Sequence, residues 1–170
     1  PQCDYLVISL HWGTEYLLEP TQEQQELAQF VADQGADLIL GHHPHVLESA
    51  QWLTRADGGQ TFCIYSLGNF VSSQNTKETM LGGMLSLTVH RRTDGTIETL
   101  APGVLPIITH FENGGKNYRV YPLEDYTQDL ISRHAVKKYD SPITLDYYNG
   151  LAQQVLGEFL QTKESFACHP

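Results

Sequence analysis

A strand, a helix and a second strand follow one another near the N-terminus, and this order restricts the fold more than any other feature of the sequence. Tyr5–Leu10 (YLVISL) and Asp37–Leu40 (DLIL) are short apolar runs with the length and composition of buried strands. The segment 21–34 between them has the spacing of an amphipathic helix. Two strands joined through a helix pair in parallel with a right-handed crossover, so the sequence predicts an α/β fold.

The expected helix has clear start and stop signals. Thr21 is predicted to be its N-cap, with Gln24 as the capping-box partner, and Gly35 follows as the C′ residue. The apolar side chains expected to face the sheet are Leu27, Phe30 and Val31.

The pattern changes to hairpins after the second strand. Asp57-Gly58-Gly59 separates two strand-like segments and indicates a tight turn. The chain of 170 residues fits one domain, 1–170, which is large enough to bury its own core. Ser141 as N-cap and Pro142 at the first helical position are expected to start the last helix. Strands are expected at 51–55, 60–66, 81–90, 96–100, 104–110 and 118–123, and C-terminal helices at 124–139 and 141–162.

Charge and cysteine content exclude several classes of function. The net charge is −10, from 20 acidic and 10 basic residues, so a nucleic-acid partner is not expected. No apolar run approaches the ~18 residues of a transmembrane helix, and no signal peptide is seen. Cys3, Cys63 and Cys168 are expected to be buried or free thiols, with a Cys3–Cys63 bridge as the alternative in an exported protein.

Histidines follow both strands of the predicted βαβ unit, at the point where each strand ends. His11 leaves the first strand, and His42, His43 and His45 lie in the Gly41–Val46 loop after the second. The carboxyl ends of parallel strands meet at one edge of a sheet, which is where open α/β sheets bind their ligands. The sequence therefore predicts that these imidazoles lie close together.

The residue types in these loops suit a divalent metal. Neutral imidazole is a common ligand for Mn, Fe and Zn, and His-x-His spacing turns the side chains of His43 and His45 to the same side of an extended loop. Pro44 between them lowers the entropy lost when they are fixed. Glu15 is a candidate ligand or a group that acts on an attacking water. His42 is left open as a supporting group, a substrate contact or a bystander.

A third segment, Tyr65–Val71, places a Gly-Asn pair after a strand. Asn69 either forms a turn or presents its amide toward the site, and the residues alone favour neither. No G-x-S-x-G motif and no phosphate-binding P-loop occurs, so nucleophilic serine chemistry has no support. The remaining histidines stand alone and are interpreted as structural or surface residues: His90, His110, His134 and His169.

Three segments together resemble the CapA family of bacterial capsule synthesis proteins, also called the PGA_cap family, which is associated with poly-γ-glutamate. These segments are 9–16 (SLHWGTEY), 41–46 (GHHPHV) and 65–70 (YSLGNF), in the order and at about the spacing of the family. The later segments 105–110 and 120–126 resemble the C-terminal part of members from Gram-positive bacteria. The resemblance extends over essentially the whole chain.

The resemblance implies a fold and a metal centre. The family is placed in the calcineurin-like metallophosphoesterase superfamily, whose domain is an α/β/β/α sandwich. By this resemblance, His11 matches the isolated metal histidine, and His43 and His45 match the paired histidines of a Gly-His-x-His block, with His42 as an extra residue. The implied cofactor is a divalent metal, Mn, Fe or Zn, with two ions in the full-length protein.

By the resemblance, Glu15 and Asn69 match recurring family positions without an assigned role, and a boundary is also implied. The catalytic roles expected in the intact protein are a hypothesis. Glu15 and His42 would orient water or protonate a leaving group, and Asn69 would contact metal-bound substrate. The Gly-Asp block that begins such domains does not precede Pro1. The chain is therefore expected to be the C-terminal part of the sandwich, with its N-terminal portion missing, and to be inactive as an isolated fragment.

At the level of function, the resemblance implies a capsule or poly-γ-glutamate biosynthesis protein with a metal-dependent phosphoesterase-like site. The substrate would be a small molecule or a polymer. Implied partners are the missing N-terminal part of the same domain and membrane-associated capsule synthesis proteins, at a membrane-anchored, extracellular location. The main alternative is a non-enzymatic component of a polymer synthesis or export complex, because fold alone does not fix function. An unrelated α/β hydrolytic domain is the third possibility.

Overall fold

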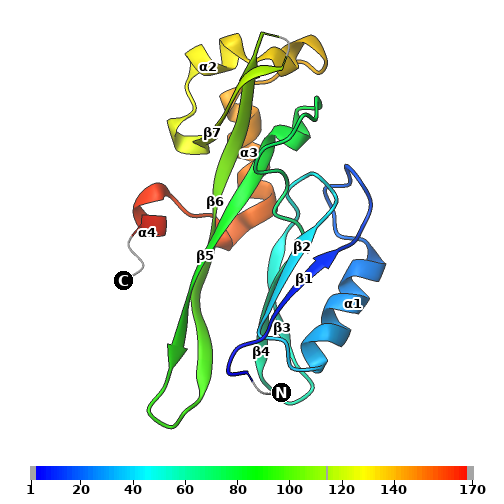
Figure 1. Ribbon diagram of the computed structural model, residues 1–170, viewed down its shortest axis with the longest axis vertical. Coiled ribbons are helices and arrows are strands. Elements are labelled where there is room, and N and C mark those ends of the chain that lie inside the picture. The colour runs from blue at the N-terminus through cyan, green and yellow to red at the C-terminus, as the bar shows by residue number, and fades with distance from the viewer. Residues whose placement is uncertain (1–2, 114, 168–170) are drawn as a thin grey trace.

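The computed structural model describes residues 3–113 and 115–167 and contains two β-sheets with helices packed on them (Figure 1). In the first sheet the order is β1-β2-β4-β3. β1 pairs in parallel with β2, and β2 with β4, whereas β3 and β4 form an antiparallel hairpin. The predicted parallel βαβ unit and the hairpin are therefore confirmed. The bounds are β1 (Val7–His11), β2 (Leu38–His42), β3 (Ala50–Thr54) and β4 (Gln60–Ile64).

Helix α1 (Gln22–Asp33) connects β1 to β2 and begins as predicted, with a full capping box between Thr21 and Gln24. The expected buried face is wrong in part. Leu27 and Phe30 are 39% and 60% exposed, and only Val31 of the expected set packs against the core. The helix instead turns its small residues to the sheet, where they allow a close approach of the two layers. The buried helix residues are Gln24, Ala28 and Ala32.

The second sheet is antiparallel, in the order β5-β6-β7. Its strands are β5 (Leu81–Arg91), β6 (Ile97–Glu112) and β7 (Lys116–Pro122). The expected separate strands at 96–100 and 104–110 are one continuous strand, β6. The register shifts between the Ser86–Gly103 and Thr88–Leu100 pairs, so a bulge takes up the residues between them without ending the strand.

The C-terminal helices differ from the expected ones. The segment 124–139 is interrupted, because the Thr127 hydroxyl accepts from the Leu130 N–H and begins a new helix. The last long helix begins after Thr144, which accepts from the Tyr147 N–H, so Ser141 is not its N-cap. The helices are α2 (Gln128–Arg133), α3 (Leu145–Leu156) and α4 (Lys163–Ala167), with short 3₁₀ turns η1 (Glu78–Met80), η2 (Leu123–Asp125), η3 (Ala135–Lys138) and η4 (Gly157–Phe159).

Two apolar clusters hold these layers together. The larger cluster joins Ile64 of the first sheet to Val104 and Ile108 of the second and to Tyr148 of α3. The smaller one lies between α1 and the first sheet and includes Ile39. The order of packing confirms the α/β fold class and is consistent with a helix–sheet–sheet–helix sandwich.

The two cysteines within the described residues are not joined by a disulfide. Cys3 is exposed and Cys63 is buried, and both are free thiols, so the alternative Cys3–Cys63 bridge is absent. Burial raises the pKa of the Cys63 thiol, which keeps it protonated. Cys168 and His169 lie outside the described residues. Among the helices that are described, none has the length and apolar character needed to span a bilayer.

Candidate metal site at the carboxyl edge of the first sheet

Backbone hydrogen bonds join the three motif loops at the carboxyl edge of the first sheet. The Trp12 N–H donates to the His42 carbonyl at 3.1 Å, and the Tyr16 N–H donates to the Pro44 carbonyl at 2.8 Å. The Leu67 N–H donates to the Gly41 carbonyl at 3.2 Å. The segments 9–16, 41–46 and 65–70 therefore form one structural unit, although β2, β3 and β4 lie between the first and the last of them in the sequence.

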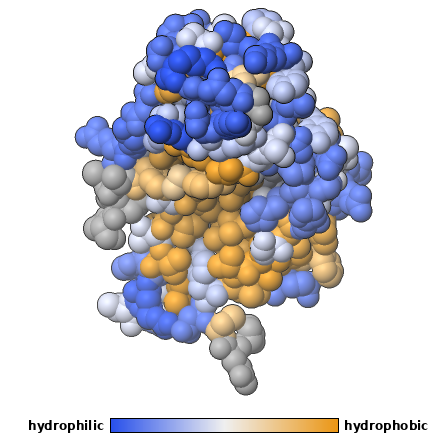
Figure 2. Space-filling view, turned by 45° about the horizontal axis from the view of Figure 1, so that its top comes forward, coloured by the Kyte–Doolittle hydropathy of each residue, from blue (hydrophilic) through white to orange (hydrophobic). Residues whose placement is uncertain are grey.

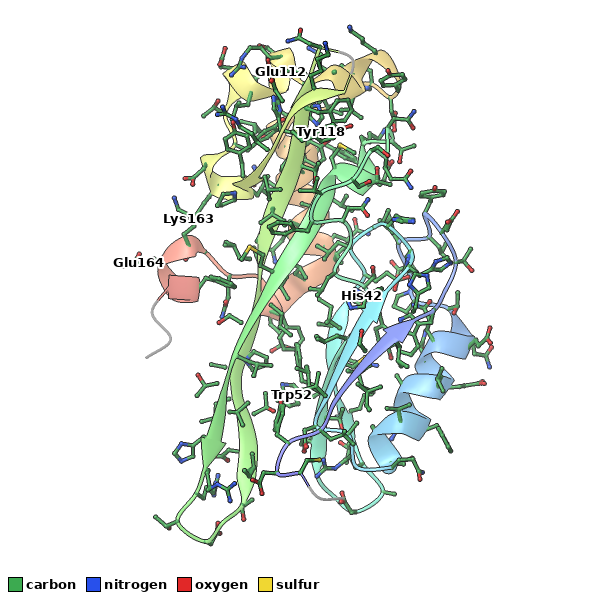
Figure 3. The ribbon with its side chains drawn as sticks, in the orientation of Figure 1. His42, Trp52, Glu112, Tyr118, Lys163 and Glu164 are labelled. Atoms are coloured by element: carbon green, nitrogen blue, oxygen red, sulfur yellow. The ribbon has the colours of Figure 1, made fainter. Side chains whose placement is uncertain are left out.

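His11 and His42 occupy equivalent positions on neighbouring strands. They are register partners in the parallel pair of β1 and β2. Side chains alternate along a strand, and Leu40 packs toward the cluster between the sheets whereas Ile39 packs toward α1. His42 shares the face of Leu40, and Figure 3 labels it near the end of β2. Burial, followed by the nearby His11 imidazole, lowers the pKa of His42.

The ring of His43 lies between those of His11 and His45. The His11 and His43 ring centroids are 4.6 Å apart, and those of His43 and His45 are 6.3 Å apart. Two imidazoles on one ion have centroids roughly 4.5–5.5 Å apart, given metal–nitrogen bonds of about 2.1 Å. The first pair has this spacing, and the second is wider. No group of three or more His, Cys, Asp or Glu side chains within 3–113 and 115–167 is already arranged to hold a metal.

Asn69 fixes the orientation and the tautomer of a neutral His45 ring. Its Nδ2 donates to two backbone carbonyls, those of His45 and Thr79, each at 3.2 Å. The amide oxygen must therefore face His45 Nδ1, at 3.0 Å, and an amide oxygen only accepts. Nδ1 consequently carries the hydrogen, and Nε2 of neutral His45 keeps its lone pair. This is the tautomer that a metal-binding imidazole requires.

Glu15 faces the free nitrogen of His45. Its Oε1 lies 3.8 Å from His45 Nε2, and the Glu15 and His45 side chains are 49% and 34% exposed. The Tyr16 ring stacks on the His45 ring, with centroids 6.1 Å apart. The Glu15 carboxylate and the His45 lone pair thus face the same solvent-accessible space. A cation or a water entering this space could contact both groups.

Three non-glycine residues adopt a positive φ in these loops: Tyr16 (68°), His43 (106°) and His45 (61°). Such conformations cost energy and cluster where the surrounding structure holds a site in place. Local sequence patterns gave no signal for them.

The loops rest on supports that sequence reasoning missed. The buried Trp12 indole N–H donates to the Tyr65 carbonyl at 2.8 Å, and the two rings stack with centroids 5.7 Å apart. Beneath them, the Gln24 side chain donates to Glu48 Oε2 at 2.8 Å. Glu48 is fully buried, and its other oxygen has no hydrogen-bond partner among the described residues. The sequence did not predict this burial, because no hydrophobic periodicity indicates that a polar residue in a loop is buried.

The buried Glu48 carboxyl makes stability depend on pH. Burial is the main cause that raises its pKa from 4.5 to about 7, against the Gln24 hydrogen bond, while Glu19 adds to the increase. Because the folded pKa exceeds the unfolded one, the free energy of unfolding falls as pH rises from 4.5 to 7. We expect Glu48→Gln to abolish this contribution, so that the variant gains up to about 3 kcal/mol relative to the parent between pH 4.5 and pH 8.

Urea unfolding of both proteins at several pH values tests this expectation, because all other titrating groups are shared. A constant difference between Glu48→Gln and the parent across this range would show that Glu48 titrates normally.

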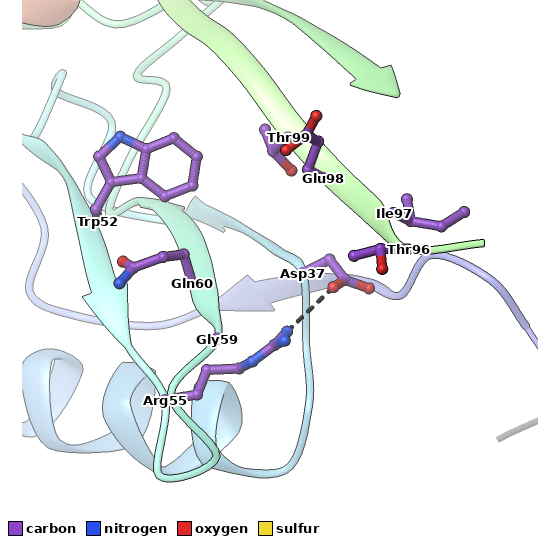
Figure 4. A pocket seen from close by; sticks show the side chains of 9 residues that line it. All are labelled: Asp37, Trp52, Arg55, Gly59, Gln60, Thr96, Ile97, Glu98 and Thr99. Atoms are coloured by element: carbon purple, nitrogen blue, oxygen red, sulfur yellow. Dashed lines mark hydrogen bonds and ion pairs between the residues drawn. The ribbon is translucent and has the colours of Figure 1, made fainter. Parts of the chain in front are cut away.

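A pocket of about 560 Å³ lies away from the histidine loops (Figure 4). It includes Asp37, which precedes β2 and therefore marks the amino edge of the sheet, opposite the histidines. Asp37 is ion-paired to Arg55 at 3.1 Å. The histidines outside the candidate site behave as follows: His90 is exposed, and His110 and His134 are buried.

Comparison with known protein sequences agrees with the motif loops. Residues 1–74 match the family described as "Bacterial capsule synthesis protein PGA_cap". The chain is 37% identical over 107 residues to "PGA biosynthesis protein CapA" of Bacillus subtilis (strain 168), covering 63% of this chain and 26% of that protein. It is 41% identical over 93 residues to "Capsule biosynthesis protein CapA" of Bacillus anthracis, covering 55% of this chain and 21% of that protein.

The fold and the edge loops define a two-sheet α/β domain with a histidine-rich carboxyl edge. The N-terminal part of the chain, residues 1–74, is similar to the PGA_cap family of bacterial capsule synthesis proteins, and the chain is similar to two CapA proteins over part of its length. It spans 26% and 21% of the two curated relatives, about a quarter of their length. All three motif segments, 9–16, 41–46 and 65–70, lie inside the matched residues.

Proposed function

We propose that this chain contributes the histidine half of a divalent-metal site that hydrolyses a phosphoester, or a related bond, during assembly of a capsule polymer such as poly-γ-glutamate. The observation that carries the proposal is the His45 tautomer. Asn69 holds Nδ1–H, and the Nε2 lone pair faces Glu15 across 3.8 Å. A histidine with only a structural role has no need of a free, accessible and oriented lone pair.

The donor set fits Mn, Fe or Zn. His11, His43 and His45 would hold the ion, since imidazole suits each of these metals. A bound ion would supply Lewis acidity and a more acidic water, and two ions would suit the full-length protein. Glu15 lies where it can accept a proton from water or complete the ligand set. His42, kept neutral by its lowered pKa, can accept or donate a hydrogen bond toward substrate.

The hydrogen bonds of Asn69 support a different task from the expected contact with substrate. Both polar atoms of its side chain are engaged by His45 and Thr79. We therefore propose that Asn69 is a positioning residue that acts through His45.

Replacing Asn69 by Leu is expected to weaken metal binding by about 10–100-fold, the usual cost of losing an outer-shell partner. The His45 ring would also lose its fixed tautomer. Calorimetric titration with Zn²⁺ and nitrogen-15 NMR of the imidazoles measure both effects. The matched control is Asn75→Leu, which replaces an exposed asparagine of the same connection between β4 and η1. Unchanged affinity and an unchanged His45 tautomer in Asn69→Leu would refute the positioning role.

Hydrolysis by the full-length protein tests the proposed activity. We expect Mn²⁺-dependent cleavage of a generic phosphodiester that is lost in His43→Ala with the fold intact. Metal binding without any turnover would favour the alternative, a non-enzymatic component of a polymer synthesis or export complex. Absence of Mn, Fe and Zn from the intact protein, by elemental analysis, would contradict both the site and the activity.

The free edge of β1 supports a proposed partner within the longer protein. β1 pairs only with β2 among the described strands, and Val7 is 46% exposed. An open parallel edge can accept a further strand. We propose that the remaining part of the domain in the longer protein covers this edge and completes the metal site, and that the whole protein works with membrane-associated capsule synthesis proteins at the outer cell surface.

A further inference from the structure

The basic residues of this acidic chain are concentrated at one end. Five of the ten Lys and Arg residues lie between Lys116 and Lys138. Elsewhere each basic side chain has a carboxylate partner: Arg55, Lys77, Arg91, Arg92 and Lys163. Among residues 3–113 and 115–167, the four basic side chains with no ion pair are Lys116, Arg119, Lys137 and Lys138, all in β7 and η3.

Three of these side chains, Arg119, Lys137 and Lys138, border two adjoining pockets. One, of about 230 Å³, lies on a face of β6 and β7 and includes Arg119 and Arg133. The other, of about 490 Å³, lies along α2 and η3 and includes Arg133, Lys137 and Lys138. Arg133 belongs to both, so the pockets form one continuous surface, hereafter the basic surface (Arg119, Arg133, Lys137 and Lys138). Figure 2 shows strongly hydrophilic residues gathered over the upper end of the molecule, where Figure 3 labels Glu112.

The basic surface already binds carboxylates of its own chain. Arg133 contacts Asp129 Oδ2 through Nε at 3.1 Å and Nη2 at 3.0 Å, and its Nη1 contacts Glu112. The buried His110 ring supports Glu112 from behind, with Nε2 at 3.2 Å from Oε1. Arg133 is thus held in place, while the side chains of Arg119 and Lys138 make no hydrogen bond or ion pair with other described residues. Guanidinium groups match carboxylate geometry.

The cations of the basic surface are distributed over two pockets, and this distribution favours a long ligand over a small one. A single small anion would meet one or two exposed cations, which are worth little in water. A polymer with many carboxylates can contact both pockets at once. Because its weak contacts are linked, the overall affinity exceeds that of any single contact. The whole chain has a net charge of −10 although it includes these cations, so the rest of the molecule repels such a polymer and binding would be confined to the basic surface.

We propose that the basic surface is a binding site for a linear polycarboxylate. Figure 1 places β7 and α2 at the upper end of the molecule, the end toward which β1 points, and Figure 3 labels His42 lower down, near mid-height. A polymer held there could extend toward the candidate metal site. Its identification with the capsule polymer rests on the proposed function, whereas the surface itself does not.

Fluorescence anisotropy with labelled poly-glutamate, in EDTA and low salt, tests the site independently of any metal. We expect binding that weakens as salt increases, and about a tenfold loss in the double variant Arg119→Ala/Lys138→Ala. The control double variant Arg91→Ala/Arg92→Ala removes the same charge at the far end of the β5–β6 hairpin and should change affinity less than about twofold.

Three outcomes would overturn the proposal: no binding of poly-glutamate, equal losses in the two double variants, or tighter binding of polyphosphate than of poly-glutamate. Because EDTA removes metals, His43→Ala should bind poly-glutamate like the parent chain. A failed polymer test therefore leaves the metal test untouched, and a failed metal test leaves this one untouched.

Discussion

Replacing Gly41 by alanine is expected to lower the free energy of unfolding by about 4 kcal/mol or more, which is close to the whole stability of many domains. An added Cβ would lie 1.7 Å from the Tyr65 carbonyl oxygen and 2.6 Å from Trp12 Nε1. The first contact is with backbone, which cannot turn aside as a flexible side chain can. The alanine would separate the loops that meet at the sheet edge.

Chemical denaturation followed by circular dichroism measures this loss. The control is Gly150→Ala, inside α3, where an added Cβ meets nothing within 4 Å. That variant should be more stable than the parent by about 0.5–1 kcal/mol, because alanine favours the helix. If Gly41→Ala were as stable as Gly150→Ala, the close packing of Gly41 against the Tyr65 backbone, just after β4, would be wrong.

Replacing His43 by alanine is expected to reduce divalent-metal affinity by at least about a hundredfold, more than the loss of an outer-shell partner. Its ring is the central one of the three, 4.6 Å from that of His11 and 6.3 Å from that of His45. Without it the remaining imidazoles have no common neighbour. Calorimetric titration with Zn²⁺ or Mn²⁺ measures the change.

His90→Ala is the matched control for His43→Ala. His90 is exposed on β5, in the second sheet, and is not part of the motif loops. It should bind metal as the parent does. Equal affinities in His43→Ala and His90→Ala would mean that the metal, if bound, uses other residues.

Local sequence signals predicted those elements whose formation is decided locally. The capping box at Thr21 and the apolar runs around α1 lead directly to the parallel strand pair. The helix face was only partly predicted, because hydrophobicity pointed to Leu27 and Phe30 whereas close packing selected Ala28 and Ala32. The expected helix 124–139 is interrupted where the Thr127 hydroxyl accepts a hydrogen bond from the Leu130 N–H and caps the start of α2.

The candidate site was predictable to the extent that sheet topology determines it. His11, His43 and His45 come together because parallel strands end at one edge. The task proposed for Asn69 was not predictable, since it depends on two carbonyls from residues far apart in the sequence, His45 and Thr79. The buried Glu48 was missed for a related reason, as no periodic pattern marks a loop carboxyl beneath a helix.

The most direct test follows the imidazole nitrogens of this chain by long-range nitrogen-15 NMR while Zn²⁺ is added. We predict that the resonances of His11, His43 and His45 shift together and saturate at the same metal concentration, with Nδ1 of His45 protonated throughout. His90 and His134 should stay unchanged. Saturation at different concentrations, or no shift in these three rings, would contradict the claim that the sheet edge gathers them into one metal site.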